Sequence, residues 1–375
     1  MITAGKGTST IRTPESLGLY REIRSAVRAG GILAGVMDTV EQFEFIQQPL
    51  FRISAGLTAM MMAVGPKIQN RSGIRADLWA ANIAQTSEGK AAPIQVIKAI
   101  GQSIASPTAC ITMPASVDDL ARFLVRDPHR IMVPVRDELS QFLWPHVPGT
   151  KSGAVVKSLD WLRRAGRGPC FVPYSWEAKT KRESEWPMST AFIGILGSGI
   201  PQIVRNAIRG EKAKYAVRGA LPKTLLFIGE GTNPMGLGNP THNIDHELLG
   251  QISRWRDWNP AEGGHITQAN GHNGEAFIQF DDEIGAAAII QDWFDDESMN
   301  EDEAFEAALH VSKISLLLAA DTFNDPRDMA CAKKPIVRTA HAELASRLVR
   351  FLMDRSSREF GGSPSPAVRA KGGKA

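Results

Sequence analysis

Residues 77–100, DLWAANIAQTSEGKAAPIQVIKAI, decide which fold this chain is expected to adopt. An apolar segment at 78–83 is followed by a turn of small residues centred on Gly89 and Lys90, and then by isoleucines at helical spacing. The predicted order is strand, turn, helix. In a phosphate-binding loop of this order, backbone N–H groups and the helix N-terminus surround phosphate oxygens while a lysine supplies positive charge. The stretch therefore predicts a phosphate site with Gly89 and Lys90 at its centre.

The loop departs from the full phosphate-binding motif at two positions. The motif places a glycine five residues before Gly89, where this chain has Ala84, and a serine or threonine after the lysine, where it has Ala91. The hydroxyl that would hold Mg²⁺ is therefore absent. Because a Gly-Lys pair also occurs in ordinary surface turns before helices, that second interpretation stays open on the loop alone.

Composition bounds the kind of protein this chain can be. Its 375 residues are 43% hydrophobic, enough for one large core or two moderate ones, and we expect one main domain with appendages. A net charge of +3 is too small to indicate a nucleic-acid-binding protein by itself. The three cysteines lie far apart and form no CxxC pair, which argues against a disulfide framework or a zinc ribbon and favours a reducing cytoplasm.

The N-terminal part is expected to form a loose arm and a helical flank. Residues 1–18 are polar and lack the apolar segment of a signal peptide. The apolar run at 55–64 lies between Arg52 and Lys67, a span too short for the roughly 20 residues of a membrane helix. We therefore expect a buried helix and no membrane partner. Its three consecutive methionines fit either core packing or an adaptable binding groove.

A carboxylate pair follows the second predicted strand. The run at 131–135 is short, apolar and rich in β-branched residues, which predicts a buried strand that leads into Asp137 and Glu138. In nucleoside triphosphatases an acidic residue at such a strand end holds the metal or its water, and a neighbouring glutamate polarises the attacking water. A solvated loop or a helix N-terminus also explains an Asp-Glu pair. Its place after a strand and downstream of the loop favours a bipartite site.

Three further segments carry candidate binding residues. In the second part of the polar stretch at 144–187, three aromatic residues are mixed with three cations. Such residues can stack bases and neutralise phosphates, or else the segment is an exposed hairpin with solvated charges. A third apolar strand is expected at 191–196, ending in a Gly-Ser-Gly turn that would put Ser198 near a γ-phosphate. The histidines and aspartate of THNIDHE, 241–247, suggest either metal ligands or the cap of a helix that begins near Asn243.

The C-terminal part is expected to be mostly helical. Residues 301–320 and 336–353 have apolar side chains at helical spacing. The turn-rich NGHNG before EAFIQFDDE predicts a hairpin ending at 275–283. The basic tail after Glu359 is rich in glycine, proline and serine and is expected to be disordered.

Taken together, four segments resemble a known family. SEGKAAP, a strand ending in DE, STAFIGILGSGIPQIV and GALPKTLLFIGEG resemble, in order and spacing, the helicase-type ATPase part of bacteriophage and mobile-element primase–helicase proteins. The resemblance implies an α/β fold with a P-loop NTPase core of the RecA/AAA kind. It divides the chain into a helical N-terminal flank, the core, a mostly helical C-terminal region and a disordered basic tail, at residues 1–75, 76–235, 236–357 and 358–375.

The resemblance also implies ATP and Mg²⁺ as cofactors and a role for each site residue. Asp137 would hold the metal, Glu138 would be the catalytic carboxylate, and Ser198 would be a sensor-like residue. Where the family carries an arginine before the apolar strand of GALPKTLLF, this chain has Lys223, which keeps the charge and loses the planar fork of a catalytic arginine. The residues expected to bind the nucleotide phosphates are Thr86, Ser87, Glu88, Gly89, Lys90 and Ala91.

The function that follows from the resemblance is an ATP-dependent helicase or translocase of phage or mobile-element DNA replication. It would act on single-stranded DNA as a homo-oligomeric ring in the cytoplasm. Fewer than 80 residues precede the core, so priming would need a separate primase. One alternative is a nucleotide-binding but catalytically weak structural or DNA-binding protein descended from such a motor, which Ala84 and Ala91 favour. Another is a small-molecule kinase on a related core, for which the sequence has no evident acceptor-binding motif.

Overall fold

The computed structural model describes most of both ends of the chain and parts of its middle. The described residues are 15–86, 88–104, 131–132, 135–136, 192–209, 221, 223–230, 243–258, 268–269, 276–331 and 335–360. Ser87, Asp137, Glu138, His242 and the aromatic and basic segment at 144–187 lie outside these ranges.

The main sheet is parallel and has the strand order β4-β6-β2-β7. Its strands are β4 (Val135–Arg136), β6 (Ile195–Gly199), β2 (Trp79–Ile83) and β7 (Leu225–Ile228). Every residue of β2, β6 and β7 is buried, as expected for a parallel sheet covered on both faces. At the carboxyl end of β2, Ile83 pairs with Gly199 on one side and Ile228 on the other. The three strands therefore end at the same edge of the sheet.

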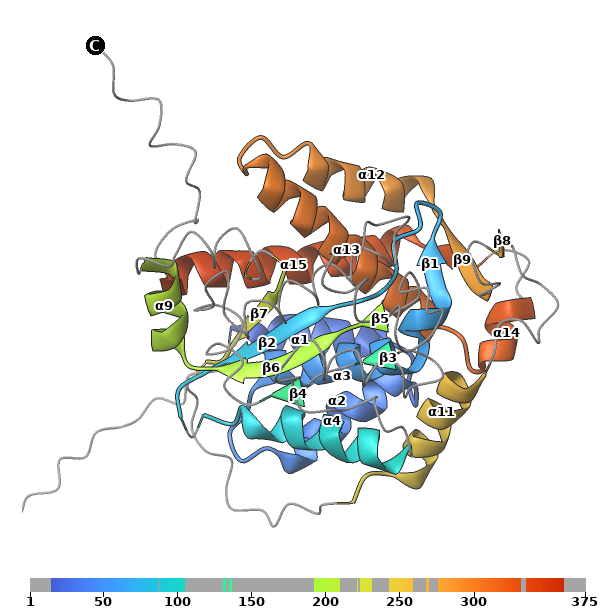
Figure 1. Cartoon of the computed structure of the whole chain (residues 1–375), viewed down its shortest axis with the longest axis horizontal. Coiled ribbons are helices and arrows are strands. Elements are labelled where there is room, and N and C mark those ends of the chain that lie inside the picture. Colours follow the sequence, from blue (N-terminus) through green and yellow to red (C-terminus); the bar gives the residue numbers. More distant parts are fainter. Residues whose placement is uncertain are drawn as a thin grey trace, which may run out of the picture.

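Helices cover both faces of this sheet (Figure 1). On one face α3 (Pro49–Val64) packs across β2, β6 and β7, while α4 (Ala91–Ser103) packs on β4 and β6. On the other face α15 (Thr339–Phe360) packs on β7 and contacts α9 (Pro201–Arg209). The chain passes from β2 through α4 to β4 and from β6 through α9 to β7, in opposite directions along the sheet. Right-handed crossovers of this kind place their helices on opposite faces.

A second, smaller sheet and the remaining helices complete the described part. In this sheet β1 (Ile68–Asn70) and β10 (Ile336–Val337) flank β9 (Ala276–Asp282) in parallel, and β8 (Gln268–Ala269) pairs with β9 antiparallel. Two short strands, β3 (Ile131–Met132) and β5 (Phe192–Ile193), pair separately. The other elements are α1 (Ser16–Ala26), α2 (Ile32–Phe43), η1 (Gly65–Lys67), α11 (His246–Asp257), α12 (Ile284–Phe294), α13 (Glu301–Asp321) and α14 (Pro326–Cys331).

Helix α3 lies at the centre of the core. All 16 of its residues are buried, and it contacts α1, α2, α4, α11 and α13. Its methionines Met60, Met61 and Met62 are at most 1% exposed, so they pack in the core and form no open groove. One hydrophobic cluster runs from α1 to α15. The N-terminal flank is therefore part of the same core as the main sheet.

Several expected elements are confirmed. The strand at 78–83 corresponds to β2, the helix after Lys90 to α4, the apolar run at 55–64 to the end of α3, and the helix at 301–320 to α13. The hairpin expected before EAFIQFDDE appears as the β8–β9 pair. No helix in the described ranges is long and apolar enough to cross a bilayer.

Other boundaries were wrong, because contacts distant in sequence set them. The run at 131–135 is not one strand: it contains β3 and β4, which join different sheets. The strand expected at 191–196 is divided at Gly194, where a Cβ atom would lie 2.1 Å from the Met61 methyl group. Its second part continues through Gly199, because Gly197 and Ser198 pair with β2. The Gly-Ser-Gly segment is therefore strand and not turn.

The last helix also differs from its expected range. Residues Ile336 and Val337 form β10, because they pair with Asp281 and Asp282 of β9. The helix then begins at Thr339, whose N–H donates to the Glu283 carboxylate at 2.6 Å. It extends to Phe360, which is 4% exposed, so residues 358–360 are helical although the tail was expected to start there.

Candidate functional site

The loop between β2 and α4 lies at the carboxyl edge of the main sheet. Strands β2 and β6 are neighbours, and their connections leave this edge in opposite directions, one towards β4 and the other towards β7. Such a topological switch point is where open α/β sheets usually bind ligands. The strand, loop and helix expected at 77–100 therefore lie where a phosphate site requires them.

Three backbone N–H groups make the hydrogen bonds that shape the loop. The Ala84 N–H donates to the Gly199 carbonyl at 3.1 Å, which joins the start of the loop to the end of β6. The Gln85 N–H donates to the Glu88 carboxylate at 2.6 Å, and the Glu88 N–H donates back to the Gln85 carbonyl at 3.3 Å. Lys90 is the N-cap of α4. That helix has neither a side-chain cap nor an acidic residue in its first turn. A helix N-terminus of this kind favours a negatively charged ligand.

Gly89 is required at its position for two reasons. Its φ of 81° lies in the left-handed region, which side chains other than glycine rarely adopt. A Cβ atom there would also lie 3.0 Å from the Ile46 carbonyl oxygen and 3.3 Å from Cγ of Gln48. The loop is therefore pressed against the segment between α2 and α3.

Ala84 occupies the position where the phosphate-binding motif has its first glycine. Its methyl group is buried, and Gly229, which follows β7, lies opposite. A Cβ atom on Gly229 would be 3.1 Å from Cβ of Ala84 and 3.0 Å from Cζ of Phe51. The methyl group that Ala84 brings in place of the motif glycine is thus accommodated by Gly229, at the end of the neighbouring strand.

The loop carries two side chains of opposite charge, Lys90 and Glu88. Lys90 is half-buried beside the α4 N-terminus, whereas Thr86 and Ala91 are exposed. The half-buried Glu88 uses its carboxylate to accept the Gln85 N–H, a backbone donor of the kind that phosphate-binding loops offer to their ligand. An incoming phosphate would compete with this carboxylate for that donor.

Ser198 lies inside β6 and not in the loop. It is 1% exposed and pairs in register with Asn82, one residue before the edge of the sheet. Asn82 accepts a hydrogen bond from the Ser54 hydroxyl of α3 at 2.7 Å. Within the described residues, the Ser198 hydroxyl and the Asn82 amide nitrogen are buried without a hydrogen-bond partner. A sensor-like role for Ser198 stays a prediction, and it would have to act from within the strand.

Lys223 lies at the opposite edge of the sheet from the loop of its own chain. It precedes β7, whose first residue Leu225 pairs with Ala80 near the start of β2. Its side chain is 7% exposed. The carboxylates Asp137 and Glu138 are outside the described residues. The strand that leads into them, β4, pairs with β6 up to Arg136 opposite Gly197.

The metal site considered in THNIDHE is replaced by a helix cap. The Asp245 carboxylate accepts the Glu247 N–H at 2.9 Å as the N-cap of α11, so the helix begins at His246 and not near Asn243. Among the described residues no three His, Cys, Asp or Glu side chains form a group that could hold a metal ion.

No protein-family model matches the chain, and no curated protein does so either.

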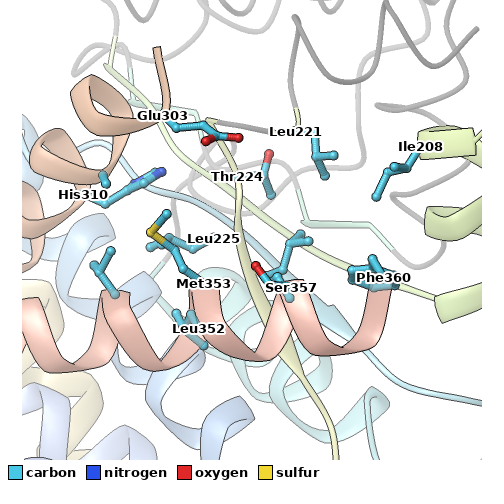
Figure 2. Close-up of a pocket in the computed structure, with 14 residues that line it drawn as sticks. Ile208, Leu221, Thr224, Leu225, Glu303, His310, Leu352, Met353, Ser357 and Phe360 are labelled. Carbon is cyan, nitrogen blue, oxygen red and sulfur yellow. The ribbon is translucent and has the colours of Figure 1, made fainter. Parts of the chain in front are cut away.

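An apolar pocket of about 150 Å³ lies away from the loop, between α9, α13, α15 and the start of β7 (Figure 2). Aliphatic side chains together with Met353 and Phe360 form most of its wall, and Glu303, Thr224 and Ser357 place oxygen atoms around it. Its lining includes no residue of the loop at 84–91. We therefore assign it no part in phosphate binding.

Sequence reasoning missed one residue of the site, Gln48. It is 1% exposed and contacts the loop from the start of α3. Its Nε2 atom donates to the Glu88 carbonyl at 2.9 Å, and its Oε1 atom accepts the Glu230 N–H at 3.1 Å. The only local signal is its place before Pro49, which marks a helix start. Nothing in the nearby sequence relates it to a loop 40 residues later.

Proposed function

We propose that this chain binds ATP at the β2–α4 loop and works as a helicase-type or translocase-type ATPase on single-stranded DNA. The phosphates lie against the backbone N–H groups at the start of α4, and Lys90 supplies the positive charge. The core is a P-loop NTPase core of the RecA/AAA kind. The protein assembles into a ring in the cytoplasm and works beside a separate primase in phage or mobile-element DNA replication.

One observation supports this proposal most strongly. The glycine-containing loop lies at the switch point of a parallel sheet, between an all-buried strand and an uncapped helix N-terminus. In the same sheet, β4 leads directly into Asp137 and Glu138, separated from β2 by β6. Carboxyl ends of parallel strands meet at one edge, so this order favours a bipartite site in which Asp137 holds Mg²⁺ and Glu138 polarises water.

A nucleotide-binding protein that hydrolyses ATP slowly or not at all is the second candidate. Ala91 lacks the hydroxyl that holds Mg²⁺ in the full motif, and Glu88 already occupies one backbone donor of the loop. Such a protein would keep ATP and DNA binding and lose turnover. The small-molecule kinase stays the least supported alternative, because the sequence shows no acceptor-binding motif.

Replacement of Lys90 tests the phosphate assignment. Lys90→Ala should weaken ATP binding by more than about tenfold, on the order of 1.4 kcal/mol, because a charge-assisted contact to phosphate is lost. Isothermal titration of ATP measures the change. Lys98, two turns further along α4 and half-buried like Lys90, provides the matched control. Unchanged affinity in a folded Lys90→Ala protein, or an equal loss in Lys98→Ala, would contradict the assignment.

Steady-state ATP hydrolysis with and without single-stranded DNA separates the two candidates. If the motor proposal is correct, DNA stimulates hydrolysis, and Glu138→Gln keeps ATP binding but loses turnover because an amide cannot act as a general base. ATP binding without DNA-stimulated turnover in the wild type, at any Mg²⁺ concentration, would favour the catalytically weak protein instead.

A further inference from the structure

Gln48 joins two strand ends at the candidate site through one side-chain amide. It accepts the Glu230 N–H, just after β7, and donates to the Glu88 carbonyl, in the loop after β2. Because one partner is an N–H and the other a carbonyl, the orientation of the amide is determined. No other neutral side chain of this length offers both a donor and an acceptor on one carbon.

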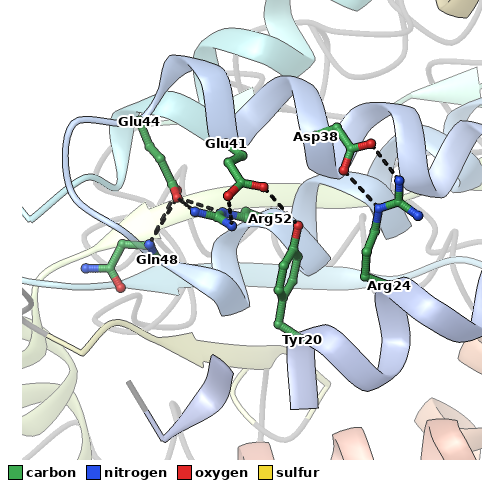
Figure 3. Close-up of polar contacts among 7 residues, drawn as sticks. All are labelled: Tyr20, Arg24, Asp38, Glu41, Glu44, Gln48 and Arg52. Atoms are coloured by element: carbon green, nitrogen blue, oxygen red, sulfur yellow. Dashed lines mark hydrogen bonds and ion pairs between the residues drawn. The ribbon is translucent and has the colours of Figure 1, made fainter. Parts of the chain in front are cut away.

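The segment that carries Gln48 is held by a buried polar cluster, drawn in Figure 3. The Gln48 N–H donates to the Glu44 carboxylate at 3.4 Å, and the same carboxylate pairs with Arg52 one turn into α3. Arg52 also pairs with Glu41 at 2.8 Å and lies over the Tyr20 ring at 5.0 Å. Residues of α1, α2 and α3 thus hold the segment that carries Gln48 in place, independently of its contacts with the loop.

Direct packing adds to these hydrogen bonds. The Ile46 carbonyl oxygen lies 3.0 Å from the position a Cβ atom would take on Gly89, and Cγ of Gln48 lies 3.3 Å from it. On the other side, Oε1 of Gln48 is 3.0 Å from the Cβ position of Gly229. Residues 46–48 therefore form a floor under the loop, in contact with two consecutive loop residues.

The bond to the Glu88 carbonyl fixes the direction of the next N–H. In a trans peptide the carbonyl and the following N–H point in opposite directions, and the described residues include no cis peptide bond. With its carbonyl turned towards Gln48, the Glu88–Gly89 peptide directs the Gly89 N–H away from the floor. Under the proposed function the phosphate binds on that side of the loop, against the start of α4.

We infer that Gln48 is a positioning residue of the phosphate site, which sets the Glu88–Gly89 peptide so that its N–H faces the bound phosphate. This role rests on the proposed function, since it concerns the same loop. It also makes the helical flank part of the nucleotide site.

Two variants of Gln48 and one matched control test this role. Gln48→Met keeps the length of the side chain and removes both hydrogen bonds. Gln48→Glu keeps the acceptor for Glu230 and loses the donor to Glu88, so it also serves if Gln48→Met does not fold. Gln42→Glu adds the same charge to the same helical flank, at an exposed side chain of α2. The probes are ATP and inorganic tripolyphosphate, measured by titration calorimetry at a temperature where circular dichroism shows each variant folded.

Both Gln48 variants should lose about tenfold or more in affinity, equally for ATP and tripolyphosphate, because the defect lies in the phosphate loop. Gln42→Glu should lose less than about threefold, the effect of screened charge alone. Gln48 variants that melt earlier but bind like the wild type would reduce Gln48 to a structural residue and overturn the inference. ATP binding by Gln48→Glu that is no weaker than binding by Gln42→Glu would also overturn it. If the wild-type protein binds neither ATP nor tripolyphosphate, the proposed function itself is overturned. If the wild type and the Gln48 variants bind both probes equally well, only the role of Gln48 is overturned.

Discussion

At the scale of single residues, the loop depends on two glycines, and each position needs glycine for a different reason. Gly89 needs its positive φ, and Gly229 provides room for the methyl group of Ala84. Two more described glycines, Gly30 and Gly73, share the positive φ but have open space where a Cβ atom would stand. A substitution at either of them therefore carries the backbone strain without the steric contact.

This difference allows a controlled prediction for Gly89. Gly89→Ala and Gly73→Ala should both lose about 1–2 kcal/mol from left-handed strain, measured as the free energy of unfolding in urea. Gly89→Ala should lose more, because Ile46 must move, and it should also weaken ATP binding by about tenfold. Gly73→Ala should bind ATP normally. Equal stability and equal ATP affinity in the two variants would show that the contact with Ile46 does not shape the site.

At the scale of elements, buried lysines join segments that no helix or strand hydrogen bonds connect. Lys67, in η1, donates to the Trp255 and Arg256 carbonyls at the end of α11. Lys313 of α13 pairs with the Asp77 carboxylate at 3.1 Å and donates to the Asp77 carbonyl at 2.7 Å, just before β2. Both lysines are at most 6% exposed. Each donates to one or two carbonyl groups beside the end of a helix or strand, where backbone groups have no hydrogen-bond partner within the element.

Lys67 should make stability rise with pH above neutrality. Burial lowers its pKa from 10.5 to about 7. Between these values the unfolded chain binds more protons than the folded one, so the free energy of unfolding increases with pH, by up to about 1.4 kcal/mol per pH unit. The neutral amine still has N–H donors for both carbonyls. Below about pH 7 the lysine is charged in both states and contributes no slope.

Urea unfolding at several pH values between 7 and 10 checks this expectation. Wild type should gain stability relative to Lys67→Met as pH rises, because only the wild type releases the proton on folding. A constant difference between the two proteins across this range would show that the Lys67 pKa is not lowered in the folded chain.

At the scale of the whole molecule, one core unites the flank, the sheet and the C-terminal helices. Helix α3 is buried along its length between the main sheet and helices from both ends of the chain. Ser16 at the start of α1 donates its N–H to Glu230, which also pairs with Arg355 of α15 at 2.6 Å. Both ends of the described chain therefore meet at the edge that carries the candidate loop.

The oligomeric prediction belongs to this scale. In ring ATPases a cation from the neighbouring subunit completes each site and contributes roughly 10³–10⁵ in rate where it is known. Lys223 lies at the opposite edge from its own loop, which suits a role towards a neighbour, but its 7% exposure requires a rearrangement on assembly. Lys223→Ala subunits should bind ATP and still poison wild-type rings in mixing experiments that follow DNA-stimulated hydrolysis. Mixtures whose activity is the simple average, or a protein that stays monomeric with ATP and DNA, would remove this role.

The sequence by itself determined the local elements of the site. The apolar run at 78–83, the glycine of the turn and the helical spacing after it predicted β2, the loop and α4, because each depends on neighbours within a turn or two. The same holds for the buried apolar helix at 55–64 and for α13. The Asp245 cap was also within reach, since a cap bonds to N–H groups two or three residues on.

The tertiary structure alone decided how these elements meet. The strand order, the burial of Ser198 and Lys223 and the division of 131–135 between two sheets follow from pairings far apart in sequence. Gln48 belongs to the site only through partners 40 and 182 residues away. Periodicity reports which face of an element is apolar, but it carries no information on which other element covers that face. Such contacts are selected by packing the whole core, and the candidate site is assembled from them.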